Sequence, residues 1–245
     1  MGKRALVMFA ICLPFLLGAQ VKVPFVGCAS DGQVGPLAAP KGKPIVVRID
    51  AEAAKQLAYY KAEKGFGVLA PRSWYCFGTC GSNGESVYVS PKLLTAKDFF
   101  SSQWDGFPGP AIQLSMSSGG TSGRFEVART IARVFPSHRD FVTSVIAEGI
   151  EPASDFPNGP YPNDKLTYKS KEMVEYETPA QTKGLGTDSW LRKNASPIRG
   201  IAILLFADTD LLQLSLRLPP DLTRLAPAII HQVEREALKA QSEIE

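Results

Sequence analysis

The sequence predicts a single α+β domain in which a largely antiparallel sheet carries about four helices, preceded by a signal peptide and an extended N-terminal arm. Three observations lead to this prediction. Residues 199–207 and 211–219 are two apolar runs joined by a short polar stretch, a pattern typical of a hairpin of covered central strands. Residues 125–135 have apolar side chains at helical spacing after a glycine-rich turn. Residues 221–241 have one apolar stripe, so we expect a C-terminal helix that lies on the sheet.

The N-terminus has the layout of a secretory signal peptide, expected over residues 1–19. Lys3 and Arg4 precede an uncharged run that ends in small residues near Ala19. The alternative, a membrane-spanning helix, needs roughly 20 apolar residues, and Lys22 follows too soon for that. We therefore expect cleavage near Ala19, a periplasmic or extracellular protein, and no stable membrane anchor.

The charge balance argues against some partners. The chain has 27 Lys and Arg residues against 24 Asp and Glu residues, and the predicted signal peptide removes two of the basic ones. General binding to nucleic acid or to an acidic membrane surface needs clustered positive charge. We therefore expect no nucleic-acid partner.

The mature chain divides into an arm and a domain. Residues 20–44 are rich in glycine and proline and have neither a helical nor a strand period, so we expect an extended arm. The α+β domain is expected over residues 45–245. It begins with a β-branched strand at 44–50, and Asp50 is expected to cap a helix over residues 51–65 that ends in glycine.

The middle of the chain alternates between strands, loops and two helices. Strand-like alternation covers residues 86–91 and 110–117, with a loop that carries aromatic anchors between them. The helix over 125–135 ends before a proline, and a second helix is expected over 137–149. Ser137 and the aspartate three residues later have the spacing of a capping box at its start.

Two long loops precede the hairpin and the last helix. Residues 151–164 contain four prolines and residues 180–197 have no regular period, so both are expected to be loops. Between them, strands at 166–169 and 172–179 flank a turn. In the C-terminal helix, Pro227 is expected either to kink the axis or to delay the start.

Three cysteines remain after the signal peptide: Cys28, Cys76 and Cys80. Outside the cytoplasm disulfides persist, and three thiols allow at most one bond within the chain. Cys76 and Cys80 would lie about 13 Å apart in an extended chain, beyond the roughly 7 Å limit for bridging, so they pair only across a tight turn. Chain entropy gives about 4 kcal/mol for a Cys28–Cys76 loop and about 2 kcal/mol for the short ring. We expect the Cys28–Cys76 disulfide, with the Cys76–Cys80 ring as the alternative.

Histidine is scarce, which limits catalytic and metal chemistry. The chain has only His138 and His231, and no short ligand spacing supports a zinc site, so we expect no metal and no cofactor. His138 and Asp140 suggest an alternative function, an envelope hydrolase with a serine or cysteine nucleophile. No Gly-x-Ser-x-Gly motif accompanies them, and we assign no catalytic residue.

The stretch SSGGTSGR, residues 117–124, is the first candidate ligand site. Ser122, Gly123 and Arg124 are expected at a helix start, where backbone N–H groups, the helix dipole and a guanidinium favour an anion. The alternative is a structural strand-to-helix turn that Ser122 caps.

A second candidate lies in the loop over residues 183–194. Trp190 stands near Lys183 and Arg192 in this loop, and tryptophan beside cations is common on recognition surfaces. The alternative is a tryptophan packed beneath the loop.

Residues 59–84, 161–191 and 197–205 resemble those of an uncharacterised exported bacterial protein family with no known activity. The resemblance implies a bacterial, exported setting and assigns no catalytic residue. The expected function is therefore a non-catalytic binding or structural module. Its expected partner is an unknown envelope protein or a small anionic ligand, and the envelope hydrolase is the alternative.

Overall fold

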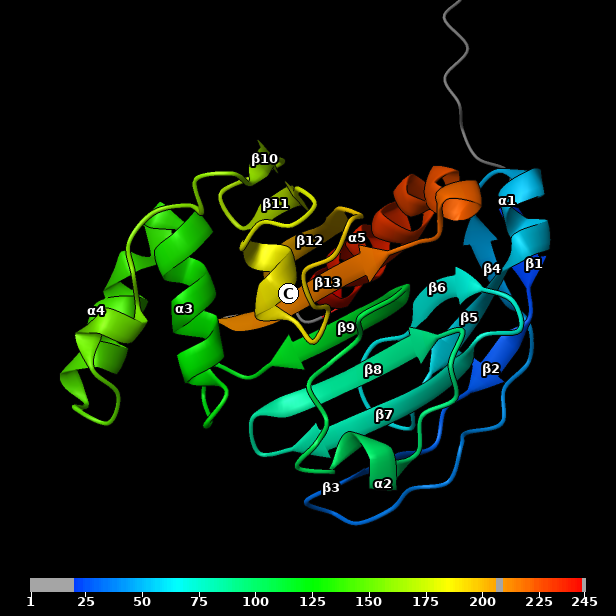
Figure 1. The fold of residues 1–245 in the computed structure, drawn as a ribbon, viewed down its shortest axis with the longest axis horizontal. Helices are drawn as coiled ribbons and strands as arrows, with labels where there is room; N and C mark the ends of the chain where they lie inside the picture. Colours follow the sequence, from blue (N-terminus) through cyan, green and yellow to red (C-terminus); the bar gives the residue numbers. More distant parts are fainter. Residues whose placement is uncertain (1–19, 206–208, 244–245) are drawn as a thin grey trace, which may run out of the picture.

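An eight-stranded sheet organises the fold (Figure 1). The computed structural model describes residues 20–205 and 209–243, so the predicted signal peptide lies outside the described residues. The strand order is β10-β11-β12-β13-β9-β8-β7-β3, and only the β3–β7 pair is parallel. The strands are β3 (Ser30–Gly32), β7 (Tyr75–Gly81), β8 (Gly84–Ser90), β9 (Ala111–Ser117), β10 (Lys165–Tyr168), β11 (Met173–Thr178), β12 (Ile198–Leu205) and β13 (Asp210–Arg217). The predicted α+β class with a largely antiparallel sheet is confirmed, as is the hairpin that β12 and β13 form.

Two smaller sheets lie beside the large one. The first pairs β1 (Gln20–Val23) with β4 (Ile45–Arg48), and the second joins β2 (Phe25–Gly27), β5 (Leu57–Lys61) and β6 (Val68–Pro71). The expectation of one sheet within the domain over residues 45–245 is therefore wrong in two respects. β4, β5 and β6 lie outside the large sheet, while β3 joins it from the N-terminal segment.

The N-terminal segment, residues 20–44, supplies one strand to each sheet. β1 pairs with β4, β2 pairs in parallel with β5, and β3 pairs in parallel with β7. Figure 1 shows this segment as the dark blue chain that passes from the two-stranded sheet down to the edge of the large one. Backbone pairing compensates for the lack of a side-chain period, because strand hydrogen bonds do not depend on side-chain identity.

The predicted helix over residues 51–65 is wrong beyond its first turns. Helix α1 (Ala51–Gln56) begins as expected, with the Asp50 side chain accepting hydrogen bonds from the backbone N–H groups of Glu52 and Ala53. The chain then enters β5, which pairs with both β2 and β6. Four successive β5 residues are buried. A strand covered on both faces has no alternation, so its residues do not show in the sequence that the helix has ended.

Five helices lie in the described part of the chain, one more than the four expected. They are α1, α2 (Ala96–Phe99), α3 (Arg124–Val134), α4 (Arg139–Ala147) and α5 (Ala226–Ser242). The additional helix, α2, is a single turn in the aromatic loop before β9. The capping box expected at Ser137 is not formed, because that residue lies in a 3-10 turn and α4 begins without a side-chain cap. None of the described helices is long and apolar enough to cross a membrane.

Helix α5 packs on the sheets as predicted. It contacts β12, β13 and β6, and the side chains of Ile229, Val233 and Ala237 in its apolar stripe are buried, as is Leu225 just before the helix. Pro227 stands in the first turn of α5, after a 3-10 turn over Pro220–Leu225. The proline therefore delays the start of the helix, because its missing N–H costs nothing in a first turn.

The two faces of the large sheet are covered differently. On one face, apolar residues of β8, β9, β12 and β13 form the main core with α5, β5 and β6. The other face carries two smaller apolar clusters. One lies beneath α3 and α4, and the other lies beneath α2 and the loop that follows it. This second face is called the polar face below, because hydrophilic side chains of the central strands lie between its two clusters.

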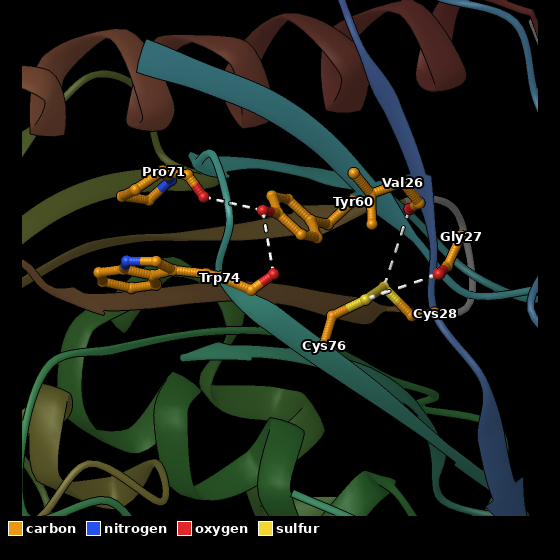
Figure 2. Close-up of a disulfide and its surroundings, with 7 residues drawn as sticks. All are labelled: Val26, Gly27, Cys28, Tyr60, Pro71, Trp74 and Cys76. Carbon is orange, nitrogen blue, oxygen red and sulfur yellow. Dashed lines mark hydrogen bonds between the residues drawn. A yellow bond between two sulfur atoms is a disulfide. The ribbon is translucent and has the colours of Figure 1, made fainter. Parts of the chain in front are cut away.

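The predicted Cys28–Cys76 disulfide is confirmed (Figure 2). It joins the N-terminal segment to β7, with the two Cα atoms 5.3 Å apart. Nearby, the buried Tyr60 hydroxyl donates to the backbone carbonyl of Pro71 at 2.8 Å. Cys80 is a buried free thiol on the same extended strand as Cys76. The short ring does not form because β7 is straight where that ring needs a turn.

Glu236 on α5 gives a pH-dependent contribution to stability. Burial raises the pKa of its carboxyl, while hydrogen bonds from Gln232 and Tyr59 lower it to a smaller extent. A raised native pKa means that the folded protein holds its proton at pH values where the unfolded chain releases it. Stability must therefore fall as pH rises from about 4.5 through the native pKa.

We expect Glu236→Gln to remove this pH-dependent contribution to the free energy of unfolding, because glutamine does not titrate. Chemical unfolding of both proteins between pH 4 and pH 8 checks it, with the slope against pH as the readout. The wild type should lose more stability than the variant as the pH rises. Parallel curves would show that Glu236 does not contribute.

Candidate functional site: a polar cleft on the sheet

A cleft of about 910 Å³ opens on the polar face of the large sheet. Strands β7, β8, β9 and β13 form its floor, and α2, α3 and the segment after β11 form its walls. The floor side chains are Thr79, Ser86, Tyr88, Gln113, Ser115, Gln213 and Ser215, and the wall side chains include Phe99, Phe100, Glu126, Asp188, Ser189 and Trp190.

The floor is built by strand register. Thr79, Ser86, Ser115 and Gln213 are directly paired neighbours on four adjacent strands, so they form one polar row across the sheet. Because side chains alternate between faces along a strand, the residues between them, such as Leu114, point into the main core. One set of strands thus supplies both an apolar core and a hydrophilic floor.

A short sequence repeat underlies this floor. Residues 113–115 and 213–215 both read Gln-Leu-Ser, and β9 pairs with β13 so that Gln113 faces Ser215 and Ser115 faces Gln213. The antiparallel pairing therefore places two amides and two hydroxyls together at the centre of the polar face. The leucines pair on the opposite face.

Hydrogen bonds orient the floor side chains. The Ser86 hydroxyl donates to Ser115 Oγ at 2.8 Å, and Gln113 Nε2 donates to the same atom at 2.9 Å. Gln113 Oε1 in turn accepts from the backbone N–H of Trp190 at 2.8 Å. A serine hydroxyl accepts two hydrogen bonds and donates one. With both acceptor positions filled, Ser115 keeps its donor for a group in the cleft.

Aromatic side chains form the wall on the α2 side. Phe99 contacts Tyr88, with ring centroids 4.7 Å apart, and its ring meets Trp190 edge-on at 6.0 Å. Phe100 is 55% exposed and Trp190 is 41% exposed. Aromatic side chains are costly to leave in water, so two exposed aromatics at one cleft indicate a contact surface.

Close packing fixes the segment that carries Trp190. Gly186 lies against Ile198, where an added Cβ would stand 2.6 Å from the isoleucine Cβ. Its N–H donates to the Thr178 hydroxyl at 2.9 Å. Farther along, the Arg217 guanidinium donates to the backbone carbonyls of Phe107, Gly109 and Arg192, which ties this segment to the loop after α2.

Asp188 supplies a carboxylate to the cleft from the 3-10 turn Leu185–Asp188. The surrounding protein raises the pKa of this carboxyl, although solvent reaches the side chain, while the Tyr161 hydroxyl donates to its Oδ1 at 2.8 Å and opposes the shift. Burial and the nearby Asp188 raise the pKa of Tyr161 to about 12. The Tyr161 hydroxyl is therefore a stable donor at physiological pH.

The cleft is acidic rather than basic. Asp31, Glu126 and Asp188 line it, and Glu126 forms an ion pair with Arg129 at 2.6 Å. None of the lining residues in the described part of the chain is lysine, arginine or histidine. The cleft thus offers hydroxyl, amide and carboxylate groups, and no cation of its own.

In the turn at residues 117–124, Ser117 lines the cleft and residues 118–124 do not. Arg124 forms a bidentate ion pair with Glu148, with Nη2 2.6 Å from Oε2. Its guanidinium also donates to the backbone carbonyl of Thr121. The Ser122 hydroxyl lies 3.0 Å from the Ser82 hydroxyl and does not cap α3, whose N-cap residue is Gly123 and which has no side-chain cap. The Arg124 guanidinium and the Ser122 hydroxyl therefore already have protein partners.

The second predicted ligand site, formed by Lys183, Trp190 and Arg192, does not come together in the structure. Trp190 lines the cleft, whereas Arg192 forms an ion pair with Asp105. Lys183 Nζ lies 5.8 Å from the ring centre of Tyr161. Of the six candidate residues, Trp190 alone lines the cleft.

Both histidines lie away from the cleft. His138 stands at the start of α4, with Nε2 3.6 Å from a carboxylate oxygen of Glu172. His231 lines a separate groove of about 320 Å³ between α5 and the β10–β12 strands. The described residues contain no group of three potential metal ligands.

The floor residues were missed because the run that forms β13 reads as apolar almost throughout, while the alternation at residues 86–91 and 110–117 was used only to predict strands. The repeated Gln-Leu-Ser was the available signal, since a polar residue at every second position of a central strand marks a face that is not packed.

Comparison of the chain with protein-family models, with curated proteins and with solved structures gives no match.

Proposed function

We propose that this protein is an exported, non-catalytic binding module whose ligand occupies the cleft on the polar face. The observation that carries the proposal is the paired Gln-Leu-Ser floor. Strands β8, β9 and β13 carry hydroxyls and amides there, although the same strands are apolar on their other face. A sheet face that needed only to be covered would carry apolar side chains, as its neighbouring clusters do.

The cleft is organised before any ligand arrives. Hydrogen bonds already connect Ser86, Ser115 and Gln113 with the backbone of Trp190. Ordering such groups in advance lowers the entropic cost of binding. The volume also lies within the range of small-molecule sites, roughly 300 to 1,000 Å³.

The lining favours a ligand without negative charge. An anion in the cleft would meet Asp31 and Asp188, while no lysine, arginine or histidine of the described chain lines the cleft, and like charges repel strongly where water is partly excluded. The anionic ligand expected from the sequence is therefore less well supported than a neutral or cationic one. Arg124, the proposed anion contact, is engaged by Glu148.

Export is part of the proposal. The disulfide is compatible with an oxidising compartment, and the signal-like N-terminus supports the same setting. The hydrolase alternative has less support, because a serine or cysteine nucleophile needs a base within hydrogen-bond reach, and neither histidine lines the cleft.

The proposal is tested by filling the cleft. In Ser115→Tyr the new ring projects into the cleft, and Ser154→Tyr places the same ring on an exposed 3-10 turn far along the chain. We expect the low-molecular-mass fraction of the native cell envelope to raise the unfolding temperature of the wild type and of Ser154→Tyr. Ser115→Tyr should fold and show no such rise. An equal rise in all three proteins would contradict the cleft as the ligand site.

A further inference from the structure

We infer that the ligand of the cleft is an oligosaccharide that carries no negative charge, a conclusion that rests on the proposed function. Three features of the cleft support it. The floor can contact a ligand only through side chains, an oriented hydroxyl donor lies in the same cleft as a carboxylate acceptor, and exposed aromatic rings stand at the wall.

The floor favours a ligand that is recognised through hydroxyl groups. Strands β8, β9 and β13 are paired on both sides, so their backbone groups are used within the sheet. A peptide that binds as an added strand needs a free sheet edge, and the cleft lies on a sheet face. The groups that remain are hydroxyls and amides, which suit a ligand with many small polar groups.

Ser115 and Asp188 provide complementary contacts. The Ser115 hydroxyl accepts from Ser86 and Gln113, so it donates into the cleft. Asp188 Oδ1 accepts from Tyr161, and its second oxygen has no protein donor in the described part of the chain. An ionised carboxylate only accepts. A ligand hydroxyl both donates and accepts, so it satisfies either residue, whereas phosphate, sulfate or carboxylate groups suit only the serine.

The exposed aromatic rings suit the apolar C–H face of a sugar ring. A pyranose ring carries C–H groups on one face, and such a face packs against an aromatic ring while its hydroxyls point outward. Phe100 and Trp190 stand on the wall beside the hydroxyl-rich floor. A purely apolar ligand would leave the Ser115 donor without a partner, which costs free energy wherever the ligand excludes water.

The test uses an array of immobilised glycans with neutral, amino and acidic members as the probe. We expect the wild type to bind neutral or amino glycans and not those whose only distinction is a carboxylate or sulfate. Trp190→Ala should weaken binding by roughly tenfold or more, and Ser115→Ala by several-fold. Tyr168→Ala, which removes a 52% exposed aromatic that does not line the cleft, should bind as the wild type does.

Three results would overturn the inference. They are the absence of glycan binding, binding confined to acidic glycans, and loss of binding in Tyr168→Ala to the same extent as in Trp190→Ala. The two proposals fail separately. If no glycan binds but Ser115→Tyr still abolishes stabilisation by the envelope fraction, the cleft serves another ligand class. If Ser115→Tyr retains that stabilisation, the proposed function itself is wrong.

Discussion

Replacing Cys28 and Cys76 together with serine is expected to lower the free energy of unfolding by about 4 kcal/mol. The disulfide closes a loop with a sequence separation of 48, and the chain-entropy model assigns its effect to the unfolded chain, which gains freedom when the loop opens. A second effect adds to this one. The N-terminal segment holds its place through strands of only three or four residues, so it depends on the bond for anchoring.

Chemical unfolding with and without a reductant measures this effect. The wild type should lose stability when reduced, and the double variant should not respond to the reductant. Cys80→Ala is the control, because it removes the free thiol and leaves the bond intact. The account of the disulfide would be wrong if reduction left the wild type unchanged, or if Cys80→Ala lost its response to reductant.

Arg217→Met is expected to destabilise the protein by about 3 kcal/mol or more, because each buried acceptor left without a donor costs roughly 1 to 3 kcal/mol. The Arg217 side chain is only 2% exposed and donates to three backbone carbonyls, those of Phe107, Gly109 and Arg192. It makes no ion pair within the part of the chain that the structure describes. Burial lowers the pKa of the guanidinium, and arginine nevertheless stays charged in proteins.

The comparison for this prediction is Arg199→Met, on the neighbouring strand. Arg199 is exposed and pairs with Glu177 at 2.8 Å, and such surface pairs contribute at most about 1 kcal/mol. Denaturant unfolding of both variants gives the difference. Arg217→Met should also change the environment of Trp190, whose segment it anchors. Equal effects of the two substitutions would show that the buried guanidinium does not hold these loops.

Elements were predictable where the sequence has a clear local pattern. Helix α5 has one apolar stripe, the β12–β13 hairpin has two long apolar runs joined by a short polar stretch, and the structure forms both. Prediction failed at β5, a short strand that is buried on both faces and directly follows α1, because continuous burial removes the alternation that distinguishes a strand. Strands β2 and β3 were also not predictable, since their positions follow from parallel pairing with residues that lie far away in sequence.

The candidate site could be predicted only in part. Trp190 was identified from its loop, and the cysteine pairing followed from chain geometry and entropy. The floor of the cleft arises from residues about 100 positions apart, such as Ser115 and Gln213, which the β9–β13 register brings together. A local sequence pattern does not show which residues of two distant strands pair with each other. The same limit applies to Arg124, which seemed available for a ligand until helix α4 placed Glu148 beside it.

The central claim is that the cleft on the polar face is the ligand site, and a chemical-shift map tests it most directly. The isotopically labelled protein would be titrated with the envelope fraction that stabilises it. We predict that the largest changes fall on Ser86, Ser115 and the indole N–H of Trp190, which line the cleft. The largest changes would instead fall on residues 117–124 or beside His231 if the ligand bound elsewhere, and that result would contradict the account.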